Sequence, residues 1–465
     1  MLFLIALGCS DPATLQTLPD PVDDSSTQDS GVDTADSGVD TGDSGERPLS
    51  CDAYSAPDGE LSNPGTLDAP WPSLQALADA QALPTSGTLC LLPGHHGAPV
   101  LRQLAGSELA IVATALQEAE LSSLQLVGVS GVRFQGLLVR GTDIETNQDE
   151  RDFWLVSADT SSTDLVFQDL VVESAQDSST WTVSDWTTRT KSGVDLRGER
   201  VQVLDTQIRN THHALSLRGD HALVQGCLVD NFGGDGIRGL GSHSTYAWNT
   251  VRDAYVDAYE TQHDDAFQAY ELEGDLKIEG VWIHHNQFLL FADPLTDFVL
   301  EQGLVGTLMQ GILLSDGYAD GWVVENNLVV NANYHGISLY GGRNCRIQNN
   351  TVVRHPEMPA DSGPWIRISD QSKTGQENFE NVIRNNLAAM LTPWDYDASS
   401  TVEANLELDD LGIFVDAAGM DFALAAGSAA LDAGESTELQ DLDLAGQSRL
   451  SGSAVDLGAF ELQLD

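Results

Sequence analysis

Lysine is almost absent from this 465-residue sequence. Three lysines occur, and 21 basic residues in total stand against 71 acidic ones, which gives a formal net charge of −50. A protein this acidic repels phosphate backbones and anionic lipid headgroups, which argues strongly against nucleic acid or an anionic membrane surface as its partner. The simplest interpretation of the acidity is a well-solvated, soluble surface.

Long apolar runs are also missing. The N-terminus reads MLFLIALGCS, and its apolar run is too short for a transmembrane helix but fits the apolar region of a signal peptide. The run ends in Gly8-Cys9 and resembles a bacterial lipoprotein signal, in which the cysteine becomes the lipidated first residue. We therefore expect a signal peptide at residues 1–9, a lipid anchor on Cys9, and a location at the bacterial outer membrane or cell surface, outside the cytoplasm.

Residues 10–50 contain almost no large apolar side chains. They are rich in Asp, Ser, Thr, Gly and Pro, and the hexapeptide DSGVDT that begins at Asp29 recurs at Asp36. Such a segment cannot bury enough apolar area to offset its ordering entropy, so it predicts a disordered, extended tether. A calcium-binding repeat is the alternative, but the acidic residues are not spaced as in a D-x-D-x-D-G loop.

A short pattern returns many times after residue 130. It consists of a turn residue, often Asn or Asp, followed by three mostly apolar residues, and its copies are separated by 21 to 41 residues. The copies begin at Gly136, Asp169, Asp205, Gly226, Asn249, Asn286, Asn327, Asn350 and Asn386. The shortest separations match one minimal coil of a β-solenoid, and the longer ones match a coil with an inserted loop.

A second strand pattern lies downstream in most of these coils. Copies such as Gly311-Ile312-Leu313-Leu314 and Gly336-Ile337-Ser338-Leu339 show the short alternation, bounded by glycine, that indicates strands. Asn tolerates the left-handed backbone of a tight turn, and stacked Asn amides can hydrogen-bond from coil to coil. A β-sandwich is the main alternative, but it predicts antiparallel strands rather than one motif that returns in the same order.

The NN-x-V-V and G-I-x-L patterns resemble the right-handed parallel β-helix superfamily, which includes pectate lyases, alginate lyases and polygalacturonases. The resemblance covers roughly residues 55–465, and it includes Asn63-Pro64-Gly65-Thr66 near the start and Gly427-Ser428-Ala429-Ala430 near the end. We therefore predict an all-β protein, a right-handed parallel β-helix (solenoid) with an N-terminal cap. The β-helix is expected over residues 51–415, followed by a terminal-coil or capping segment at 416–465.

The cysteines fit this fold. Cys51 and Cys90 are candidates for a disulfide that staples the N-terminal end outside the cytoplasm. Cys227 and Cys345 lie four to five coils apart, which is on the order of 20 Å at the spacing of stacked strands. A disulfide needs Cα atoms within about 7 Å, so Cys227 and Cys345 are predicted to be buried free thiols.

The resemblance implies that a polysaccharide binds along one outer face of the helix. On the second strand of each coil, the variable position of G-I-x-L faces outward in this fold, and polar residues recur there and nearby. The predicted substrate-binding residues are Arg197, Arg218, Gln268, Tyr270, Gln310 and Tyr340. Tyrosines suit sugar ring faces and arginines suit carboxylates.

Eight of the 21 basic residues fall within 64 residues of the chain. They are Arg189, Lys191, Arg197, Arg200, Arg209, Arg218, Arg238 and Arg252. Two interpretations carry equal weight. The residues form a cationic track on which an acidic glycan docks, or they pair individually with neighbouring Asp and Glu.

The resemblance to lyases also implies a set of catalytic residues. A lyase needs a base that removes the proton next to a carboxylate and a cation that stabilises the resulting anion. Asp265, His335, Arg367 and Arg238 are the catalytic candidates. No cofactor is certain, but Ca²⁺ is a candidate, with Asp264, Asp265 and Asp316 as its ligands.

The leading hypothesis is a monomeric polysaccharide lyase that acts on an acidic glycan. The first alternative is a non-catalytic glycan-binding adhesin. The second is a polygalacturonase-like hydrolase, whose motif order is matched by Asp235-Gly236-Ile237, Asp264-Asp265 and His335-Gly336-Ile337. Two features depart from that family: the Gln310 coil intervenes, and Ser369 stands where a lysine normally occurs.

Overall fold

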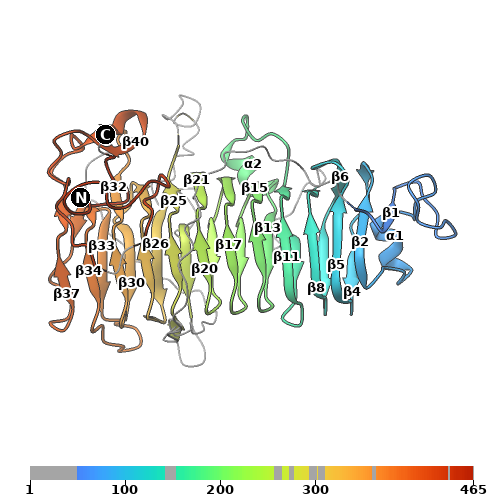
Figure 1. Ribbon diagram of the computed structural model, residues 1–465, viewed down its shortest axis with the longest axis horizontal. Helices are drawn as coiled ribbons and strands as arrows, with labels where there is room; N and C mark the ends of the chain where they lie inside the picture. The colour runs from blue at the N-terminus through green and yellow to red at the C-terminus, as the bar shows by residue number, and fades with distance from the viewer. Residues whose placement is uncertain are drawn as a thin grey trace, which may run out of the picture.

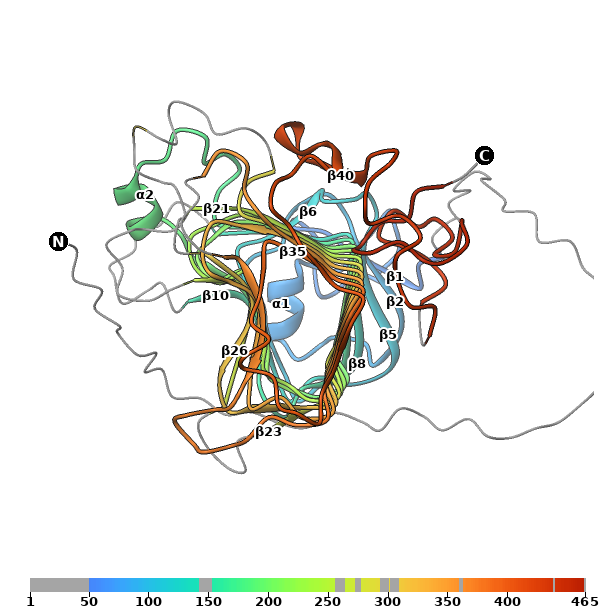
Figure 2. The same ribbon diagram turned by 90° about the vertical axis from the view of Figure 1, so that its left-hand side faces the viewer.

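The computed structural model describes residues 50–141, 153–255, 264–271, 277–292, 301, 309–358, 363–437 and 440–463. In this part of the chain, successive coils stack along one axis (Figure 1), and three long parallel sheets form the faces that enclose the core (Figure 2). We name them sheet I, sheet II and sheet III, in the order in which each coil visits them. The predicted signal peptide with Cys9, and residues 10–49 of the predicted tether, lie outside the described residues.

The strands of the three sheets alternate along the chain. Sheet I contains β1 (Ala53–Ser55), β2 (Ser86–Leu91), β5 (Ala105–Ala113), β8 (Ser130–Gln135), β11 (Thr163–Gln168), β14 (Gln202–Leu204), β17 (Leu223–Gln225), β20 (Thr245–Ala247), β24 (Trp282–His284), β28 (Val323–Glu325), β31 (Arg346–Gln348), β34 (Val382–Arg384) and β37 (Thr401–Glu403). Sheet II contains β3 (Gly94–His95), β6 (Ala119–Leu121), β9 (Leu138–Arg140), β12 (Val171–Glu173), β15 (Gln207–Thr211), β18 (Leu228–Phe232), β21 (Thr250–Ala254), β25 (Gln287–Leu289), β29 (Leu328–Asn331), β32 (Thr351–Arg354), β35 (Leu387–Ala388) and β38 (Leu406–Glu407). Sheet III contains β4 (Val100–Arg102), β7 (Leu124–Val127), β10 (Trp154–Ala158), β13 (Ser192–Leu196), β16 (Leu215–Leu217), β19 (Ile237–Gly239), β22 (Asp265–Tyr270), β26 (Gln310–Asp316), β30 (His335–Tyr340), β33 (Trp365–Ser369) and β36 (Met390–Leu391). A two-stranded sheet adds β23 (Lys277–Glu279) and β27 (Tyr318–Asp320).

The described strands of sheets I, II and III pair in parallel, each with the same strand of the next coil. In sheet I, for example, Val224 lies opposite Tyr246, and Tyr246 opposite Ile283. These three side chains point inward and are buried, so the inner residues of consecutive coils pack on one another along the axis. The parallel pairing confirms the predicted β-helix and contradicts the β-sandwich alternative, which required antiparallel strands.

Stacked asparagines line the turn between sheets I and II. The side-chain amide of Asn249 donates to Asn286 Oδ1 at 2.9 Å, Asn286 to Asn327 at 3.0 Å, and Asn327 to Asn350 at 3.0 Å. The file continues through Asn386. The predicted coil-to-coil hydrogen bonds are therefore confirmed.

In the copies that begin at Gly136, Asp169, Asp205 and Gly226, the predicted turn residue has the left-handed backbone, whereas in the copies that begin with Asn a different residue has it. Positive φ angles occur one position earlier than the stacked asparagines, for example at Trp248, His285 and Asn326. Where two asparagines are adjacent, as in Asn326-Asn327, the first adopts the left-handed conformation and the second makes the stacked hydrogen bonds. Two adjacent residues therefore share the two roles for which Asn is suited: the first has the left-handed backbone, and the second makes the hydrogen bonds from coil to coil.

The N-terminal end of the solenoid is closed by a short helix, α1 (Leu74–Asp79), which lies over the core when the molecule is viewed along its axis (Figure 2). The Ser73 side chain caps this helix, and Leu74 and Leu77 are buried against the first coils. Cys51, just before β1, and Cys90, in strand β2, form a disulfide in the first coils, with their Cα atoms 5.7 Å apart. This confirms the predicted staple, and Cys227 and Cys345 are buried free thiols as predicted.

The chain after β38 folds back along the outside of the last coils. This C-terminal segment, described at residues 409–437 and 440–463, contains β39 (Phe414–Asp416), a 3₁₀ helix (Ala417–Gly419) and β40 (Asp421–Leu424). It lies outside the solenoid in Figure 2. Phe422 of this segment packs with Val330 and Val353 of the outer face of sheet II in an apolar cluster that is separate from the core inside the solenoid. Among the described residues, no helix is long and apolar enough to cross a membrane.

Candidate functional site

The outer face of sheet III presents one file of side chains along the axis. The register places Asp195 opposite Ser216, Ser216 opposite Arg238, and Arg238 opposite Gln268. Leu313, Ser338 and Arg367 continue the file. These are the variable positions of the G-I-x-L copies, so the register confirms that they form one file.

A cluster of charged residues lies at the start of β19 and β22. Arg238 Nε donates to Asp235 Oδ2 at 2.6 Å, and the backbone N–H of Asp235 donates to His213 Nδ1 at 3.0 Å. The backbone N–H of Asp265 donates to Asp235 Oδ1 at 2.9 Å, and Gln268 Nε2 donates to Asp265 Oδ2 at 2.8 Å. We call these five residues the carboxylate cluster.

Burial shapes the electrostatics of the carboxylate cluster. Burial by itself lowers the pKa of Arg238, but the negative charge of Asp235 and its neighbours outweighs this effect and raises the pKa above its ordinary value. Arg238 is therefore a permanent cation that contacts Asp235 and is also influenced by the charge of Asp264. Asp265 is fully buried, and so is the Oε1 atom of Gln310 on the next coil, which has no hydrogen-bond partner in the described part of the chain.

A second cluster lies farther along the same face, on β30 and β33. Trp365 Nε1 donates to Ser338 Oγ at 2.9 Å and also reaches His335 Nδ1 at 3.3 Å. The guanidinium of Arg367 lies 5.3 Å from the centre of the Trp365 ring and 5.4 Å from that of Tyr340. We call Tyr334, His335, Tyr340, Trp365 and Arg367 the aromatic platform.

The aromatic platform is more open than the carboxylate cluster. Tyr334 is 44% exposed, and its ring lies 5.0 Å from that of Trp365. Arg367 Nε also lies 3.1 Å from Asp395 Oδ2, which holds the guanidinium in place. Trp365 was not among the predicted site residues. Its position on the same strand as Arg367, two residues earlier, is the sequence signal that could have identified it, and the structure places it opposite His335.

The four predicted catalytic residues do not form one centre. Arg238 and Asp265 lie on neighbouring coils, and His335 and Arg367 lie on neighbouring coils. Two coil steps separate Asp265 from His335, about 10 Å, and four separate Arg238 from Arg367, about 19 Å. The structure therefore divides the set between the carboxylate cluster and the aromatic platform.

The predicted calcium ligands are not brought together. Asp265 lies opposite Gln310 at the start of β22, whereas Asp316 lies opposite Tyr270 at its end. Five residues of strand separate the two positions, about 17 Å, so one ion cannot bind Asp264, Asp265 and Asp316. Asp316 instead accepts a hydrogen bond from Lys373 Nζ at 2.6 Å. Within the described ranges, no group of three or more His, Cys, Asp and Glu is placed to hold a metal ion.

The remaining predicted substrate-binding residues are engaged with other side chains or buried. Arg197 and Arg218 both bind the carboxylate of Asp195, at 2.6 and 3.0 Å. Tyr270 is buried, and a register shift after Ala269 places it opposite Asp316 rather than Ser315, the residue expected from the repeat.

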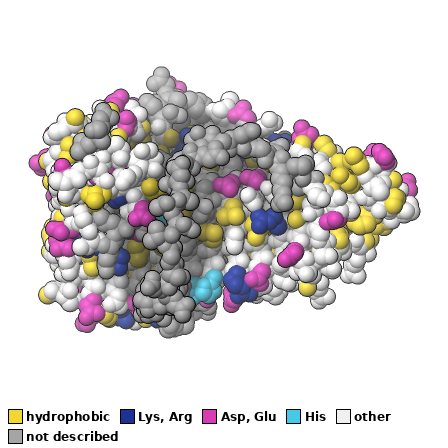
Figure 3. Space-filling view, viewed as in Figure 1, with side chains coloured by type: hydrophobic (Ala, Val, Ile, Leu, Met, Phe, Trp, Pro, Cys, Tyr) yellow, Lys and Arg dark blue, Asp and Glu magenta, His cyan; other side chains and the backbone are white. Residues whose placement is uncertain are grey.

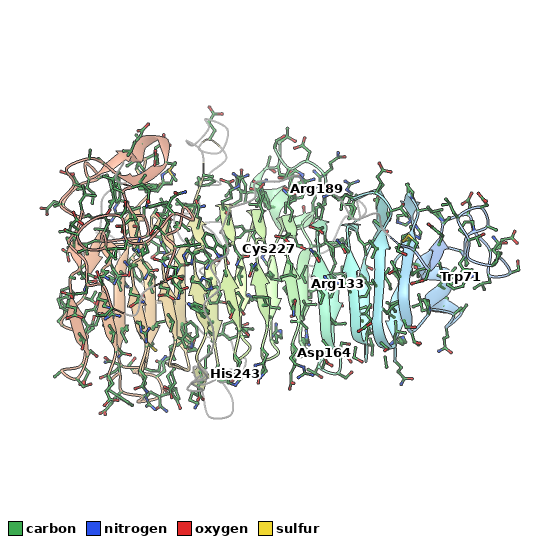
Figure 4. All side chains as sticks on the ribbon, in the orientation of Figure 1. Trp71, Arg133, Asp164, Arg189, Cys227 and His243 are labelled. Atoms are coloured by element: carbon green, nitrogen blue, oxygen red, sulfur yellow. A yellow bond between two sulfur atoms is a disulfide. The ribbon has the colours of Figure 1, made fainter. Side chains whose placement is uncertain are left out.

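The eight clustered basic residues do not form a single cationic track. Arg209 binds Glu173 on sheet II, Arg200 binds Asp164 at the turn between sheets III and I, and Arg238 binds Asp235 on sheet III. Figure 4 shows Arg189 and Asp164 at opposite margins of the molecule. Acidic side chains are scattered over the face seen in Figure 3. The seven arginines pair with Asp or Glu, as the second interpretation expected, and Lys191 lies over the ring of Phe153.

A family model that matches part of the chain agrees with the architecture. Residues 178–387 match the family described as right handed beta helix region. No curated protein matches the sequence.

Solved structures with a similar course of the chain include pectate lyase Pel9A, at 16% identity and TM-score 0.44, covering 88% of this chain and 96% of that one. A rhamnogalacturonan lyase is 15% identical, with TM-score 0.45 and coverage of 78% and 90%. A GH136 lacto-N-biosidase from Eubacterium ramulus is 12% identical, with TM-score 0.46 and coverage of 76% and 67%.

Proposed function

We propose that this right-handed parallel β-helix is a carbohydrate-active protein that holds an acidic polysaccharide against the outer face of sheet III and cleaves it as a lyase. The observation that carries the proposal is the presence of two complementary clusters along the same face, each with an arginine of the outward file, Arg238 in one and Arg367 in the other. The aromatic platform offers ring faces and an arginine. The carboxylate cluster offers a carboxylate beside a permanent cation.

The aromatic platform would bind sugar units away from the scissile bond. Tyr334 and Trp365 are partly open aromatic surfaces, on which the apolar faces of sugar rings can pack. Arg367 is held between the Tyr340 and Trp365 rings, and a guanidinium in a fixed position suits a planar carboxylate. A substrate with both a ring face and a carboxylate, that is, a polyuronate, matches this pair of features.

The carboxylate cluster would carry out the elimination. Asp265 would take the proton from the carbon next to the substrate carboxylate, while Arg238 stabilises the negative charge that develops there. A carbon–carbon double bond then forms, the neighbouring carbon–oxygen bond breaks, and the leaving oxygen takes up a proton from solvent. Gln268 would hold Asp265 in the orientation seen here.

The test is incubation of the purified protein with alginate, pectate and chondroitin, with the ultraviolet absorbance of the unsaturated product as the readout. We expect absorbance to rise with one of these polymers, Asp265→Asn to remove turnover while substrate still binds, and Arg367→Ala to weaken binding at least several-fold. Asp164→Asn and Arg133→Ala are matched controls, because these residues lie on other faces of the solenoid. Absence of any unsaturated product from all three polymers would refute the lyase.

A non-catalytic glycan-binding protein is the second candidate. The observation that favours it is the burial of Asp264 and Asp265, since an enclosed carboxylate does not reach a sugar without movement of its surroundings. This candidate predicts saturable binding that Arg367→Ala weakens, with no new absorbance and no new reducing ends. New reducing ends without absorbance would instead indicate a hydrolase.

We also propose that the chain is exported and anchored by lipid on Cys9. The support is the Gly8-Cys9 sequence together with the Cys51–Cys90 disulfide, because disulfides form and persist outside the cytoplasm. Metabolic labelling with palmitate in the native host is expected to mark the protein, and Cys9→Ala is expected to release it from the membrane fraction. Retention of the Cys9→Ala variant in the membrane would contradict this anchor.

A further inference from the structure

A column of left-handed residues runs along the turn between sheets I and II, on a different edge from the proposed glycan face. Asp205, Gly226, Trp248 and His285 occupy it on four consecutive coils, each with φ between 47° and 68°. Gly226 carries no side chain, and we call its place in the column, between the Asp205 side chain on one side and the Trp248 side chain on the other, the notch. Cys227, the next residue after this glycine, marks its place in Figure 4.

Trp248 forms one wall of the notch. Its ring stacks on the ring of His285 on the following coil, with 4.2 Å between ring centres and 19° between planes. Because the coils stack along one axis, the opposite face of the indole is turned toward the Gly226 coil. Trp248 is 38% exposed although one face of its ring stacks on His285. Burial lowers the pKa of His285, so the ring behind Trp248 is uncharged at neutral pH.

Asp205 forms the opposite wall. A Cβ atom placed on Gly226 would collide with Asp205 Oδ1, so this carboxylate reaches into the space that the glycine leaves empty. Burial and the nearby charge of Asp169 raise the pKa of Asp205. No ion pair within the described ranges involves Asp205. A carboxylate with a like charge nearby therefore lies next to Gly226 on one side, and the Trp248 ring lies on the following coil on the other side.

We propose that this notch binds an organic cation, a guanidinium or primary ammonium group, between the Trp248 ring and the Asp205 carboxylate. A cation over the face of tryptophan is attracted by the ring quadrupole, and tryptophan is the strongest of the aromatic side chains in this respect. The cation would also offset the repulsion between Asp169 and Asp205. A net charge of −50 raises the local concentration of cations around the whole protein. The site is independent of the proposed lyase activity.

The experiment follows the indole N–H signal of Trp248 by NMR in ¹⁵N-labelled protein, with the signal assigned from its loss in Trp248→Phe. Three peptides are titrated: acetyl-Gly-Arg-Gly-amide, the lysine equivalent, and the equivalent with citrulline, which has nearly the shape of arginine but no charge. We expect a saturable shift with the arginine peptide, the lysine peptide or both, and none with citrulline. The response to arginine against lysine identifies which cation the notch prefers.

Two substitutions locate the binding. Asp205→Asn is expected to weaken the saturable shift by about tenfold, since it removes the charge of one wall. Gly226→Asn fills the notch, because its Cβ atom displaces the Asp205 carboxylate. The left-handed backbone accepts Asn, since Asn326 and Asn349 occupy the same position on later coils with similar φ. Asp164→Asn, which removes a remote acid, controls for general attraction. An equal response to citrulline, no saturable shift with either cation, or affinities unchanged in Asp205→Asn and Gly226→Asn would overturn the proposal.

Discussion

Asn327 shows how one side chain connects three coils. Its amide nitrogen donates to Ile283 O and Asn350 Oδ1, while its amide oxygen accepts from both the backbone and the side chain of Asn286. The residue is fully buried, so none of these groups has access to water in its place. The hydrogen bonds act between coils, which is why Asn recurs once in each coil from Asn249 to Asn405.

We predict that Asn327→Ala lowers the free energy of unfolding by about 2–4 kcal/mol, because several buried polar groups lose their partners. Urea denaturation followed by circular dichroism measures the effect. Asn405→Ala is the matched control: Asn405 accepts from Asn386 at the last coil, where it is less buried, and the loss is expected to be smaller. Equal losses for the two variants would contradict this account of the asparagine file.

His284 makes the stability of the protein depend on pH. Burial and the adjacent His285 lower the pKa of His284 to about 3, whereas an unfolded chain has its histidine pKa near 6.5. Between these values the unfolded state binds more protons than the folded state, so the free energy of unfolding decreases as the pH falls from about 6.5 toward 3.

The prediction is tested by measuring urea midpoints at pH 7.5 and pH 5. The decrease is expected to be smaller in His284→Gln, which cannot take up a proton, than in the wild-type protein. His95→Gln is the control, because His95 is exposed and contacts only Ser122 in a side-chain hydrogen bond. An identical pH dependence in wild type and His284→Gln would show that this histidine does not contribute.

The outer face of sheet II changes character along its length. On the earlier coils, Arg140, Glu173, Arg209 and Asp230 follow one another in register with alternating charge. On the later coils the same file becomes apolar, through Leu289, Val330 and Val353. The change coincides with the coils that the C-terminal segment covers, so this segment removes from water the apolar strip that the later strands would otherwise expose.

Phe422→Ala is expected to detach the C-terminal segment from sheet II. Phe422 is buried in the outer apolar cluster, and removing a buried phenylalanine typically costs about 3–5 kcal/mol. Hydrogen exchange is expected to rise in residues 409–463 and on the later strands of sheet II, while the earlier coils stay protected. Phe134→Ala, inside the solenoid, is the contrasting variant and is expected to raise exchange in the coils around β8 instead. Protection of residues 409–463 that survives Phe422→Ala would disprove this view of the segment.

At the scale of the whole molecule, charge opposes compactness. Ion pairs such as Arg209–Glu173 and Arg238–Asp235 offset part of the net charge of −50, but the excess of acidic residues leaves strong repulsion over the surface. Salt screens exposed charges over about 10 Å at 0.1 M. We predict that the urea midpoint rises between 10 mM and 200 mM NaCl. Sucrose matched in osmolality is the control, and a midpoint that falls with salt would mean that the ion pairs outweigh the repulsion.

Much of the architecture could be predicted, because each coil repeats its own local pattern. The Asn249–Asn386 file, the outward file through Arg238 and Arg367, and the Cys51–Cys90 disulfide are all as predicted. Alternation within a strand decides which side chains face outward, and this property is local to a few residues. The repeat alone then places equivalent residues in one file.

The candidate site depended on distances that no repeat encodes. The register shift after Ala269 places Tyr270 opposite Asp316. The burial of Asp265 depends on neighbours that are distant in the chain, and so does the pairing of Arg209 with Glu173. The sequence by itself determined the coil, its turn residues and its outward file, because these follow from local backbone and side-chain preferences. The tertiary structure alone decided which carboxylates pair with which arginines and how far apart the two clusters lie. It also decided that the C-terminal segment covers sheet II. These contacts depend on how many residues each coil inserts between its strands.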